Sequence, residues 1–175
     1  MIQTKLKGAI RDIPDFPKPG ILFKDITPIL KDAALCCDIL DAFAAELKDV
    51  EIDVIAGIES RGFLFGLMLA NKLGVPFVPI RKQGKLPFKK IQQPCELEYG
   101  SAILELHEDA ISPGQKVLIH DDLLATGGTV SAATRLVKQL EGEIAGYAFV
   151  ISLDFLNGKE GLKRESPNII SLISY

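Results

Sequence analysis

The sequence predicts an α/β protein whose central, mainly parallel sheet is flanked by helices. Short apolar runs of strand length alternate along the chain with segments in which apolar residues recur every three or four positions. Most of these runs are apolar throughout, which is typical of strands that are covered on both faces of a parallel sheet. The 175 residues, 47% of them hydrophobic, fit a single domain over residues 1–175 with an ordinary core.

The first half of the chain is expected to contain two helices and two strands. Residues 32–48 carry apolar side chains at helical spacing, and Asp32 is suited to be the N-cap. The run "DVIAGI" predicts a strand over 53–58, and "GFLFGLMLANKLG" predicts a helix over 62–74 that ends at its last glycine. The run "VPFVPI" predicts the next strand over 75–80.

The second half continues the same alternation. Strands are expected over 116–120 and 146–153, with a helix over 128–142 between them. Residues 168–174, "NIISLIS", are suited to an edge strand. These elements complete the parallel sheet.

A segment of different character lies between the two halves. Residues 95–111 alternate with the two-residue period of an exposed antiparallel hairpin. The preceding stretch, "RKQGKLPFKKIQQP" at 81–94, is basic and polar and contains two prolines. We expect a stretch like this in a compact domain to be a functional loop or a disordered one.

Charge and composition argue against several classes of protein. The net charge of −3 and the pI near 5.4 give no reason to expect nucleic acid or an anionic membrane as a partner. The longest uncharged apolar stretch, 62–70, is far shorter than the roughly 20 residues of a membrane span. The first residues contain no apolar run of signal-peptide length, and the three cysteines lack the spacing of metal or redox pairs. A reduced, cytoplasmic protein is expected.

Common catalytic motifs are missing from the sequence. "GIESRGFL" at 57–64 has the glycine spacing of a P-loop, but Phe63 and Leu64 stand where Lys and Ser or Thr are required. No GxGxxG fingerprint and no GxSxG elbow occur. His107 and His120 have no partner at metal-ligand spacing, so we expect packing or surface roles, although His120 directly precedes an acidic pair and could contact a site there.

The stretch "KVLIHDDLLATGGTV", residues 116–130, carries the strongest functional signal. Asp121 and Asp122 follow the expected strand, and ligands of open α/β sheets bind at the carboxyl ends of strands. The turn "ATGGT" at 125–129 then opens a helix. Its glycines permit unusual dihedrals, its threonines add hydroxyl groups, and the free N–H groups of the helix start can hold a monophosphate.

The acids and the turn suit different parts of one ligand. Carboxylates accept hydrogen bonds from hydroxyl groups or bind a phosphate-bound metal, but they do not serve as phosphate ligands. A sugar phosphate satisfies both halves, with its vicinal diol on the acids and its 5′-phosphate in the turn. Each residue taken singly is better explained as a helix cap or a chain turn, and it is their combination at a strand-to-helix junction that favours a sugar-phosphate site.

"VLIHDDLLATGGT" resembles the phosphoribosyl-diphosphate signature of the type I phosphoribosyltransferases. Four more stretches resemble the members of that family that act on adenine, and they occur in the family's order: "DFPKPGILFKDITPIL" (15–30), "GIESRGFLFG" (57–66), "RKQGKLP" (81–87) and "LEYG" (97–100). The resemblance spans nearly the entire chain. It implies the type I fold, with a small N-terminal hood over 1–30 that binds the base and a flexible antiparallel lid over 81–108.

The resemblance further implies a reaction. The 5-phosphoribosyl group of phosphoribosyl diphosphate would pass to adenine with the help of Mg²⁺, giving AMP and diphosphate, and the enzyme would be a homodimer. The metal would be held mainly by the substrate phosphates and not by protein ligands. Because positive charge grows on the ribose in the transition state, the two adjacent acids could stabilise that charge while they fix the hydroxyl groups.

Roles for individual residues follow from the same resemblance. The sugar phosphate would be bound by Asp121, Asp122, Leu124, Ala125, Thr126, Gly127, Gly128 and Thr129. The diphosphate would be bound by Glu59, Ser60, Arg61, Arg81, Lys82 and Lys85, with a non-proline cis peptide between Glu59 and Ser60. Adenine would be bound by main-chain groups of Leu22 and Lys24 and by the ring of Phe23. The catalytic residues would be Glu98, as acid/base, with Asp121, Asp122 and Arg61, and Tyr99 would cover the site.

Other interpretations stay open at this point. Phe23 is also suited to core packing, Lys89 and Lys90 to a solvated basic face, and Glu98 to an outward position of an alternating strand. Xanthine, or hypoxanthine and guanine, could replace adenine, although a different hood would be expected for those bases. A regulatory protein could keep the sugar-diphosphate site without catalysis, but it should then carry a DNA-binding module or lack the lid.

Overall fold

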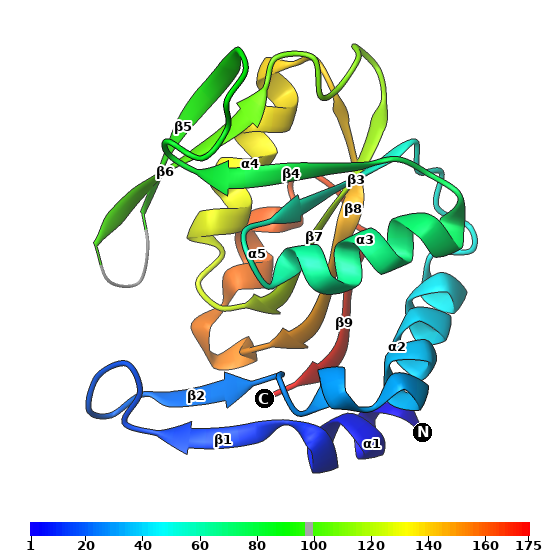
Figure 1. Ribbon diagram of the computed structural model, residues 1–175, viewed down its shortest axis with the longest axis vertical. Coiled ribbons are helices and arrows are strands. Elements are labelled where there is room, and N and C mark those ends of the chain that lie inside the picture. The colour runs from blue at the N-terminus through cyan, green and yellow to red at the C-terminus, as the bar shows by residue number, and fades with distance from the viewer. Residues whose placement is uncertain (97–99) are drawn as a thin grey trace.

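A seven-stranded sheet forms the centre of the protein, in a computed structural model that describes residues 1–96 and 100–175 (Figure 1). Its strands are β3 (Val54–Ile58), β4 (Phe77–Lys82), β5 (Lys90–Glu96), β6 (Ser101–His107), β7 (Lys116–Leu124), β8 (Glu143–Ser152) and β9 (Ile169–Ser174). They lie in the order β5-β6-β4-β3-β7-β8-β9. Strands β4, β3, β7, β8 and β9 are parallel to one another, whereas β6 and β5 extend the sheet beyond β4 in antiparallel fashion. The predicted α/β class with a mainly parallel sheet is confirmed.

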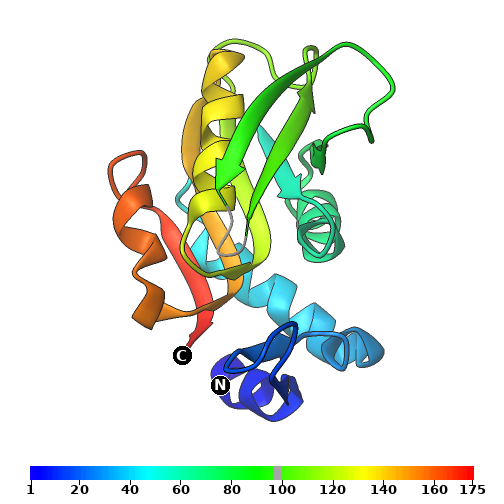
Figure 2. The same cartoon turned by 90° about the vertical axis from the view of Figure 1, so that its left-hand side faces the viewer.

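Helices cover both faces of this sheet (Figure 2). They are α1 (Ile2–Ala9), α2 (Ala33–Glu46), α3 (Gly62–Leu73), α4 (Gly128–Gln139) and α5 (Gly158–Leu162), with the 3₁₀ turns η1 (Ile29–Lys31) and η2 (Asp154–Leu156). Strand β7 contributes to the core on either side: Val117 and Ile119 pack in the core with α4, and Leu118 packs in the core with α2 and α3. None of the helices in the described ranges combines the length and the apolar character needed to cross a bilayer.

The helices and strands expected from periodicity are present, with boundaries shifted by up to three residues except at the end of β7 and the start of β5. The side chain of Asp32 accepts a hydrogen bond from the Leu35 amide at 3.0 Å, which confirms it as the N-cap of α2. Helix α3 ends at Leu73 and is capped by Gly74, whose φ of 71° lies in the left-handed region that favours glycine. Local signals for caps and apolar faces therefore determine these elements.

Strand β7 is longer than predicted. Its pairing with β3 ends at His120, opposite Gly57, but its pairing with β8 continues to Leu124, opposite Ser152. The acidic pair therefore lies inside the strand and not after its end, which corrects the expectation from the sequence. Along this last stretch β7 has lost its neighbour on the β3 side, and a ligand can approach there.

The basic stretch 81–94 is not entirely a loop. Strand β5 begins at Lys90 and pairs with β6 over its whole length, so the antiparallel hairpin starts earlier than predicted. Pro94 obscured this strand in the sequence, yet it is tolerated because β5 is an edge strand and needs no amide donor on its open side.

The N-terminal residues form a separate small layer below the carboxyl ends of the parallel strands (Figure 1). Strands β1 (Arg11–Pro14) and β2 (Leu22–Asp25) pair in antiparallel register to form a two-stranded ribbon. Helix α1, which the sequence analysis did not predict, precedes them and buries Leu6 in the core shared with α2 and α3. This layer corresponds to the predicted hood over 1–30.

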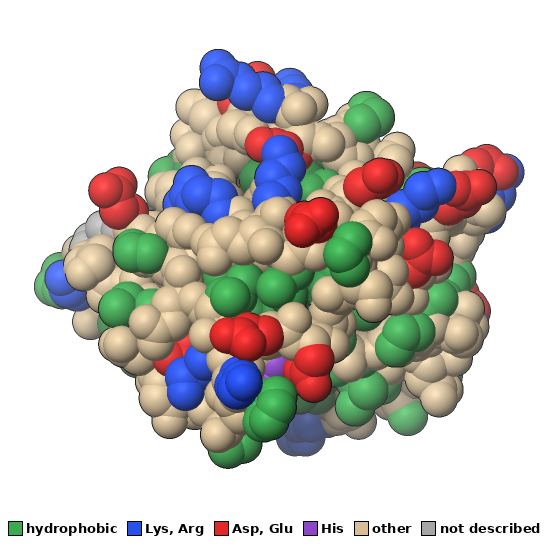
Figure 3. All heavy atoms as spheres, turned by 90° about the horizontal axis from the view of Figure 1, so that it is seen from above, with side chains coloured by type: hydrophobic (Ala, Val, Ile, Leu, Met, Phe, Trp, Pro, Cys, Tyr) green, Lys and Arg blue, Asp and Glu red, His purple; other side chains and the backbone are tan. Residues whose placement is uncertain are grey.

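The end of the molecule opposite the hood carries charges of both signs (Figure 3). Basic and acidic side chains are interspersed over this face and do not gather into one extended basic surface. This face thus agrees with the charge balance of the sequence.

Candidate active site

The loop between β7 and α4 forms one wall of a cleft. Gly127, with φ at 86°, directly precedes α4, and its carbonyl accepts a hydrogen bond from the Ser131 amide at 2.8 Å. The helix therefore begins immediately after the loop, and the amide groups of its first turn have no partner within the helix. Together with the positive end of the helix dipole, they suit an anion such as a monophosphate.

Helix α5 supports this loop from behind. A Cβ atom added at Gly127 would lie 2.9 Å from the carbonyl oxygen of Gly158, and one added at Gly158 would lie 2.2 Å from that of Ala125. Glycine at both positions lets α5 and the loop approach more closely than any other residue would allow. Gly158 was not identified from the sequence, since the loop that it supports is distant along the chain.

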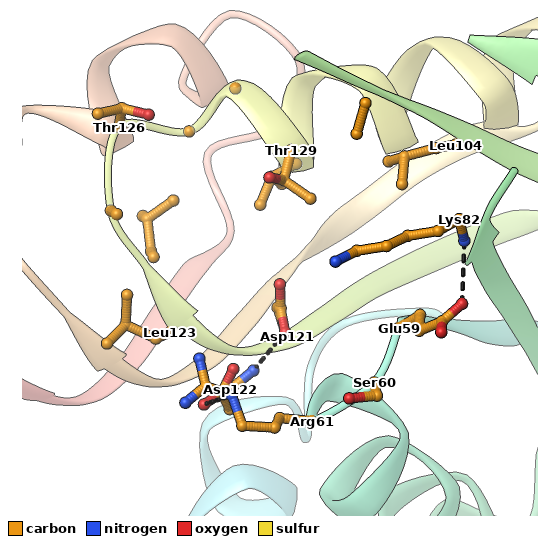
Figure 4. A pocket seen from close by; sticks show the side chains of 16 residues that line it. Glu59, Ser60, Arg61, Lys82, Leu104, Asp121, Asp122, Leu123, Thr126 and Thr129 are labelled. Atoms are coloured by element: carbon orange, nitrogen blue, oxygen red, sulfur yellow. Dashed lines mark hydrogen bonds and ion pairs between the residues drawn. The ribbon is translucent and has the colours of Figure 1, made fainter. Parts of the chain in front are cut away.

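Asp121 and Asp122 lie at the foot of the cleft (Figure 4). The Asp122 amide donates to Asp121 Oδ1 at 2.9 Å, and Asp122 Oδ2 pairs with Arg61 Nε at 3.1 Å. Burial and the neighbouring charge of Asp122 raise the pKa of Asp121 well above its ordinary value. Burial also raises the pKa of Asp122, although the Arg61 guanidinium opposes the shift. Carboxyl groups held in such surroundings are typical of functional sites.

The second wall begins where β3 ends. The peptide bond between Glu59 and Ser60 is cis, as the family resemblance implied. Helix α3 starts two residues later at Gly62, where a Cβ atom would lie 2.9 Å from the His120 carbonyl oxygen. Glycine at this position allows the start of α3 to lie close to β7, which brings Arg61 beside Asp122.

Glu59 organises the cations at the end of β4 and just after it. Its Oε2 accepts hydrogen bonds from Arg81 Nε at 3.2 Å and from the Lys82 amide at 2.9 Å, and its Oε1 accepts one from Lys85 Nζ at 2.5 Å. Partial burial would raise the pKa of Glu59, but these three hydrogen bonds outweigh it and lower the pKa. Arg81 and Lys85 are therefore turned toward Glu59, whereas the side chain of Lys82 extends across the cleft (Figure 4).

These elements enclose a cleft of about 270 Å³. It brings together all eight residues predicted for the sugar phosphate, together with Glu59, Ser60, Arg61 and Lys82 from the predicted diphosphate set. Arg81 and Lys85 do not line it. The lining also includes four apolar residues that the sequence analysis did not select, namely Ala102, Leu104, Leu123 and Val130. Ala102 and Leu104 could have been found from the alternation of the hairpin, because they share one face of β6.

The three residues predicted to bind adenine lie in β2, beside the cleft but not in its lining. The centroid of the Phe23 ring is 5.0 Å from Arg61 Cζ, within the range of a cation–π contact, and Phe16 packs edge-on against the same ring. Lys24 pairs with Asp12, and Leu22 is half exposed. Phe23 is thus connected to Asp122 through Arg61, which links the hood to the acidic pair.

The hairpin of β5 and β6 approaches the loop between β7 and α4, residues 125–127, which we call the phosphate-side loop. A Cβ atom at Gly128 would lie 2.2 Å from the carbonyl oxygen of Glu96, so glycine there permits the end of β5 to lie against the start of α4. The predicted acid/base Glu98 and the predicted covering residue Tyr99 lie at positions 97–99, outside the residues that the structure describes.

His120 packs inside the protein and does not line the cleft. It is fully buried, and its ring meets Phe43 edge-on at a centroid distance of 5.6 Å. Neither ring nitrogen has a hydrogen-bond partner among the residues that the structure describes. Burial lowers the pKa of His120 to about 4, so the ring is neutral near pH 7. His120 therefore has the packing role that the sequence suggested, and it does not contact the cleft.

Both the sequence and the fold are similar to those of known proteins. Residues 29–172 match the family model of the phosphoribosyl transferase domain. The adenine phosphoribosyltransferase of Cytophaga hutchinsonii is 50% identical over 175 residues, which cover 100% of this chain and 97% of that protein. The crystal structure of adenine phosphoribosyltransferase from Thermoanaerobacter pseudethanolicus superposes with a TM-score of 0.95 at 50% identity, covering 99% of each chain. The enzyme from Saccharomyces cerevisiae, in complex with an imino-altritol bisphosphate and adenine, gives a TM-score of 0.90 at 44% identity over 98% of each chain.

Proposed function

The chain belongs to the phosphoribosyltransferase family, among the adenine phosphoribosyltransferases, and from this premise we propose that it transfers the 5-phosphoribosyl group of phosphoribosyl diphosphate to adenine. The products are AMP and diphosphate, and the reaction is one of purine salvage. The chain is thus a pentosyltransferase. The observation that carries the assignment is that an acidic pair and a phosphate-type loop line one cleft, next to the hood segment that resembles the adenine-specific members.

Ribose is held between the loop and the acidic pair in this proposal. Thr126, Thr129 and the amides at the start of α4 bind the 5′-phosphate, while Asp121 and Asp122 accept hydrogen bonds from the two ribose hydroxyl groups. As the bond to diphosphate breaks, positive charge develops on the ribose. The carboxylates of Asp121 and Asp122 are poorly solvated, so they stabilise this positive charge strongly. Electrostatic attraction is stronger in such surroundings than in water.

The diphosphate lies on the other side of the cleft. Ser60 and Arg61 follow the cis peptide, and Lys82 extends toward the loop from the end of β4. Arg81 and Lys85 are held by Glu59 and contribute positive potential from behind it. Positive groups on this side favour departure of the diphosphate, since negative charge accumulates on it as the bond breaks.

Mg²⁺ fits this arrangement as a companion of the substrate. The described residues contain no cluster of three His, Cys, Asp or Glu that could hold a metal by themselves, and the carboxylate of Glu59 is already paired with cations. Mg²⁺ would therefore be held mainly by oxygen atoms of the substrate phosphates, while Asp121 and Asp122 accept the ribose hydroxyl groups. When bound, the metal neutralises diphosphate charge.

Adenine is placed by the hood. Main-chain groups of Leu22 and Lys24 pair with the edge of the base, and the ring of Phe23, which also contacts Arg61 and Phe16, offers a stacking face. Glu98 takes the proton that adenine loses as the new bond forms, and Tyr99 covers the site. Closure of the hairpin over the ribose excludes water, which would otherwise hydrolyse the sugar diphosphate.

One assay tests the proposed function. The protein is mixed with phosphoribosyl diphosphate and Mg²⁺, and release of diphosphate is followed with adenine, hypoxanthine, guanine, xanthine or no base. We expect release with adenine alone, together with AMP. Release with a different base would keep the chemistry of the cleft and reject our assignment of the hood. Binding of the sugar diphosphate without release on any base would favour the regulatory protein instead.

We extend the proposal to assembly and location. A homodimer is supported by the family and by exposed leucines on α3, where Leu64 and Leu67 are 39% and 57% exposed. Sedimentation equilibrium should give twice the mass of the 19.0 kDa chain, and a single-chain mass would contradict the dimer.

A cytoplasmic location is supported by three cysteines that form no disulfide. Fractionation of the native cells, with the protein detected by antibody, would test this location.

A further inference from the structure

Strand β2 makes a second anchoring contact on the side away from the cleft. Successive side chains of a strand point to opposite faces, so Phe23 faces Arg61 while Lys24 faces Tyr175. Lys24 Nζ lies 3.7 Å from the centroid of the Tyr175 ring. The same nitrogen is 2.7 Å from Oδ1 of Asp12, which is the cross-strand partner of Lys24 in β1. The base segment is therefore attached to the rest of the protein from both of its faces.

The contact between Lys24 and Tyr175 takes place out of water. Only 7% of the Lys24 side chain is exposed, and a buried ammonium group is costly unless charge or hydrogen bonds compensate it. The carboxylate of Asp12 supplies the opposite charge, and the face of the Tyr175 ring adds a cation–π attraction to the Lys24 ammonium. Cation–π attraction is strongest when the cation is desolvated, as it is here.

Tyr175 is itself fixed to the sheet. Its amide donates to the Ser152 carbonyl at 2.9 Å, and its carbonyl accepts from the Asp154 amide at 2.9 Å. The residue continues the line of β9 and packs against the core that contains α2 and α3. The ring thus presents a stationary surface to the hood.

The ribbon of β1 and β2 needs such an external support. A two-stranded sheet is marginally stable by itself, so its position over the cleft is set by its contacts with the larger sheet. We propose that Tyr175 is a positioning residue for the base: through Lys24 it fixes the main chain of β2, and with it the groups that read the edge of adenine. This inference rests on the proposed function, because it presumes that β2 binds the base.

Steady-state kinetics of Tyr175→Leu and Tyr175→Phe test the inference. With leucine, the KM for adenine should rise roughly tenfold, as expected when a desolvated cation–π contact is lost, while the KM for phosphoribosyl diphosphate and kcat stay within about twofold. Phenylalanine keeps the ring and should restore the wild-type KM for adenine. The matched control is Phe155→Leu, which alters an aromatic residue that is 69% exposed in η2 and should change neither constant.

A second variant addresses the possibility that Tyr175→Leu does not fold. Asp12 is half exposed on β1, and Asp12→Asn removes one of the two groups that hold the Lys24 ammonium without disturbing the core. This variant should raise the KM for adenine severalfold and leave that for the sugar diphosphate unchanged. The inference would be overturned if the KM for adenine were unchanged in either folded variant. It would also be overturned if the KM for adenine and the KM for phosphoribosyl diphosphate rose equally. In both cases, an active wild-type protein would still uphold the proposed function. Wild-type protein that forms no AMP from adenine would overturn both.

Discussion

At the scale of single residues, the acidic pair combines function with a cost in stability. Asp121 and Asp122 are adjacent and poorly solvated, and only Asp122 has a cationic partner, Arg61, among the described residues. Ionisation of both is unfavourable in the folded protein without ligand. We interpret this cost as the counterpart of the charge that the ribose acquires during transfer.

Asp121→Asn should therefore stabilise the fold while it removes activity. The pKa of Asp121 is raised by folding, so the folded state keeps a proton that the unfolded chain releases at lower pH, and the free energy of unfolding falls as pH rises through the raised pKa. Asparagine removes this dependence. We expect a higher melting temperature than wild type at pH 8, a smaller difference at pH 4, and a loss of kcat of about 100-fold or more.

Calorimetric melts at the two pH values and initial-rate assays would measure these effects. Asp122→Asn is an informative companion, since it also leaves Arg61 without its carboxylate and should stabilise the protein less. Full activity in Asp121→Asn would rule out the role that we assign to the pair.

Lys82 and Lys85 should differ in their effect, although both belong to the same basic stretch. Lys82 extends into the cleft, whereas Lys85 is paired with Glu59 and does not line it. Lys82→Met should weaken binding of phosphoribosyl diphosphate about tenfold, as expected for a lost charge-assisted hydrogen bond, and Lys85→Met should weaken it less. Titration calorimetry with the sugar diphosphate would compare them, and a larger loss with Lys85→Met would show that Glu59 releases that lysine to the ligand.

At the scale of elements, the phosphate-side loop depends on a short helix that never contacts the ligand in our proposal. Gly158→Ala in α5 would place a Cβ atom 2.2 Å from the Ala125 carbonyl oxygen, so the loop has to shift. We expect the KM for phosphoribosyl diphosphate to rise about tenfold, because a displacement of the order of 1 Å is costly in a positioned site. Gly161→Ala is the matched control, since its added Cβ meets no atom within 4 Å. Equal kinetics of the two variants would show that the loop does not rely on α5.

Some of the helices and strands could be predicted from the sequence and others could not. The helices over 32–48 and 62–74 and most parallel strands were predictable, because caps and apolar periodicity are local signals. Helix α1 and strand β5 were not, since α1 is stabilised by burial of Leu6 against distant segments and β5 carries a proline that only an edge position tolerates.

The same limit applies to the cleft. The loop and the acidic pair form one continuous motif, and all eight of their predicted residues line the cleft. The division of the basic residues was not predictable, because it depends on the Glu59 carboxylate, which lies more than twenty positions earlier in the chain. The family resemblance therefore identified the cations, and only tertiary contacts separate those that face the cleft from those that do not.

At the scale of the whole molecule, the buried neutral side chain of His120 makes the free energy of unfolding depend on pH. The pKa of His120 is lowered from 6.5 to about 4 on folding, so its contribution to stability is fully present above pH 6.5 and is lost as pH falls toward 4. His120→Leu replaces the imidazole with an apolar side chain of similar size that cannot ionise. The free energy of unfolding of this variant should fall less than that of wild type between pH 7 and pH 5. Urea unfolding at both pH values would measure the difference, and parallel losses would exclude His120 as the acid-sensitive group.

The hood lies almost entirely outside the segment that matches the family model, which begins at residue 29. In our proposal, the chemistry of the sugar diphosphate and the choice of base are therefore encoded in different stretches of the chain. A change of base preference during evolution would then require a new first segment while the catalytic machinery stayed unaltered. A transplanted hood would need to preserve an aromatic ring toward Arg61 and a cation toward Tyr175, and the remainder of its sequence would be free to diverge with the nucleobase.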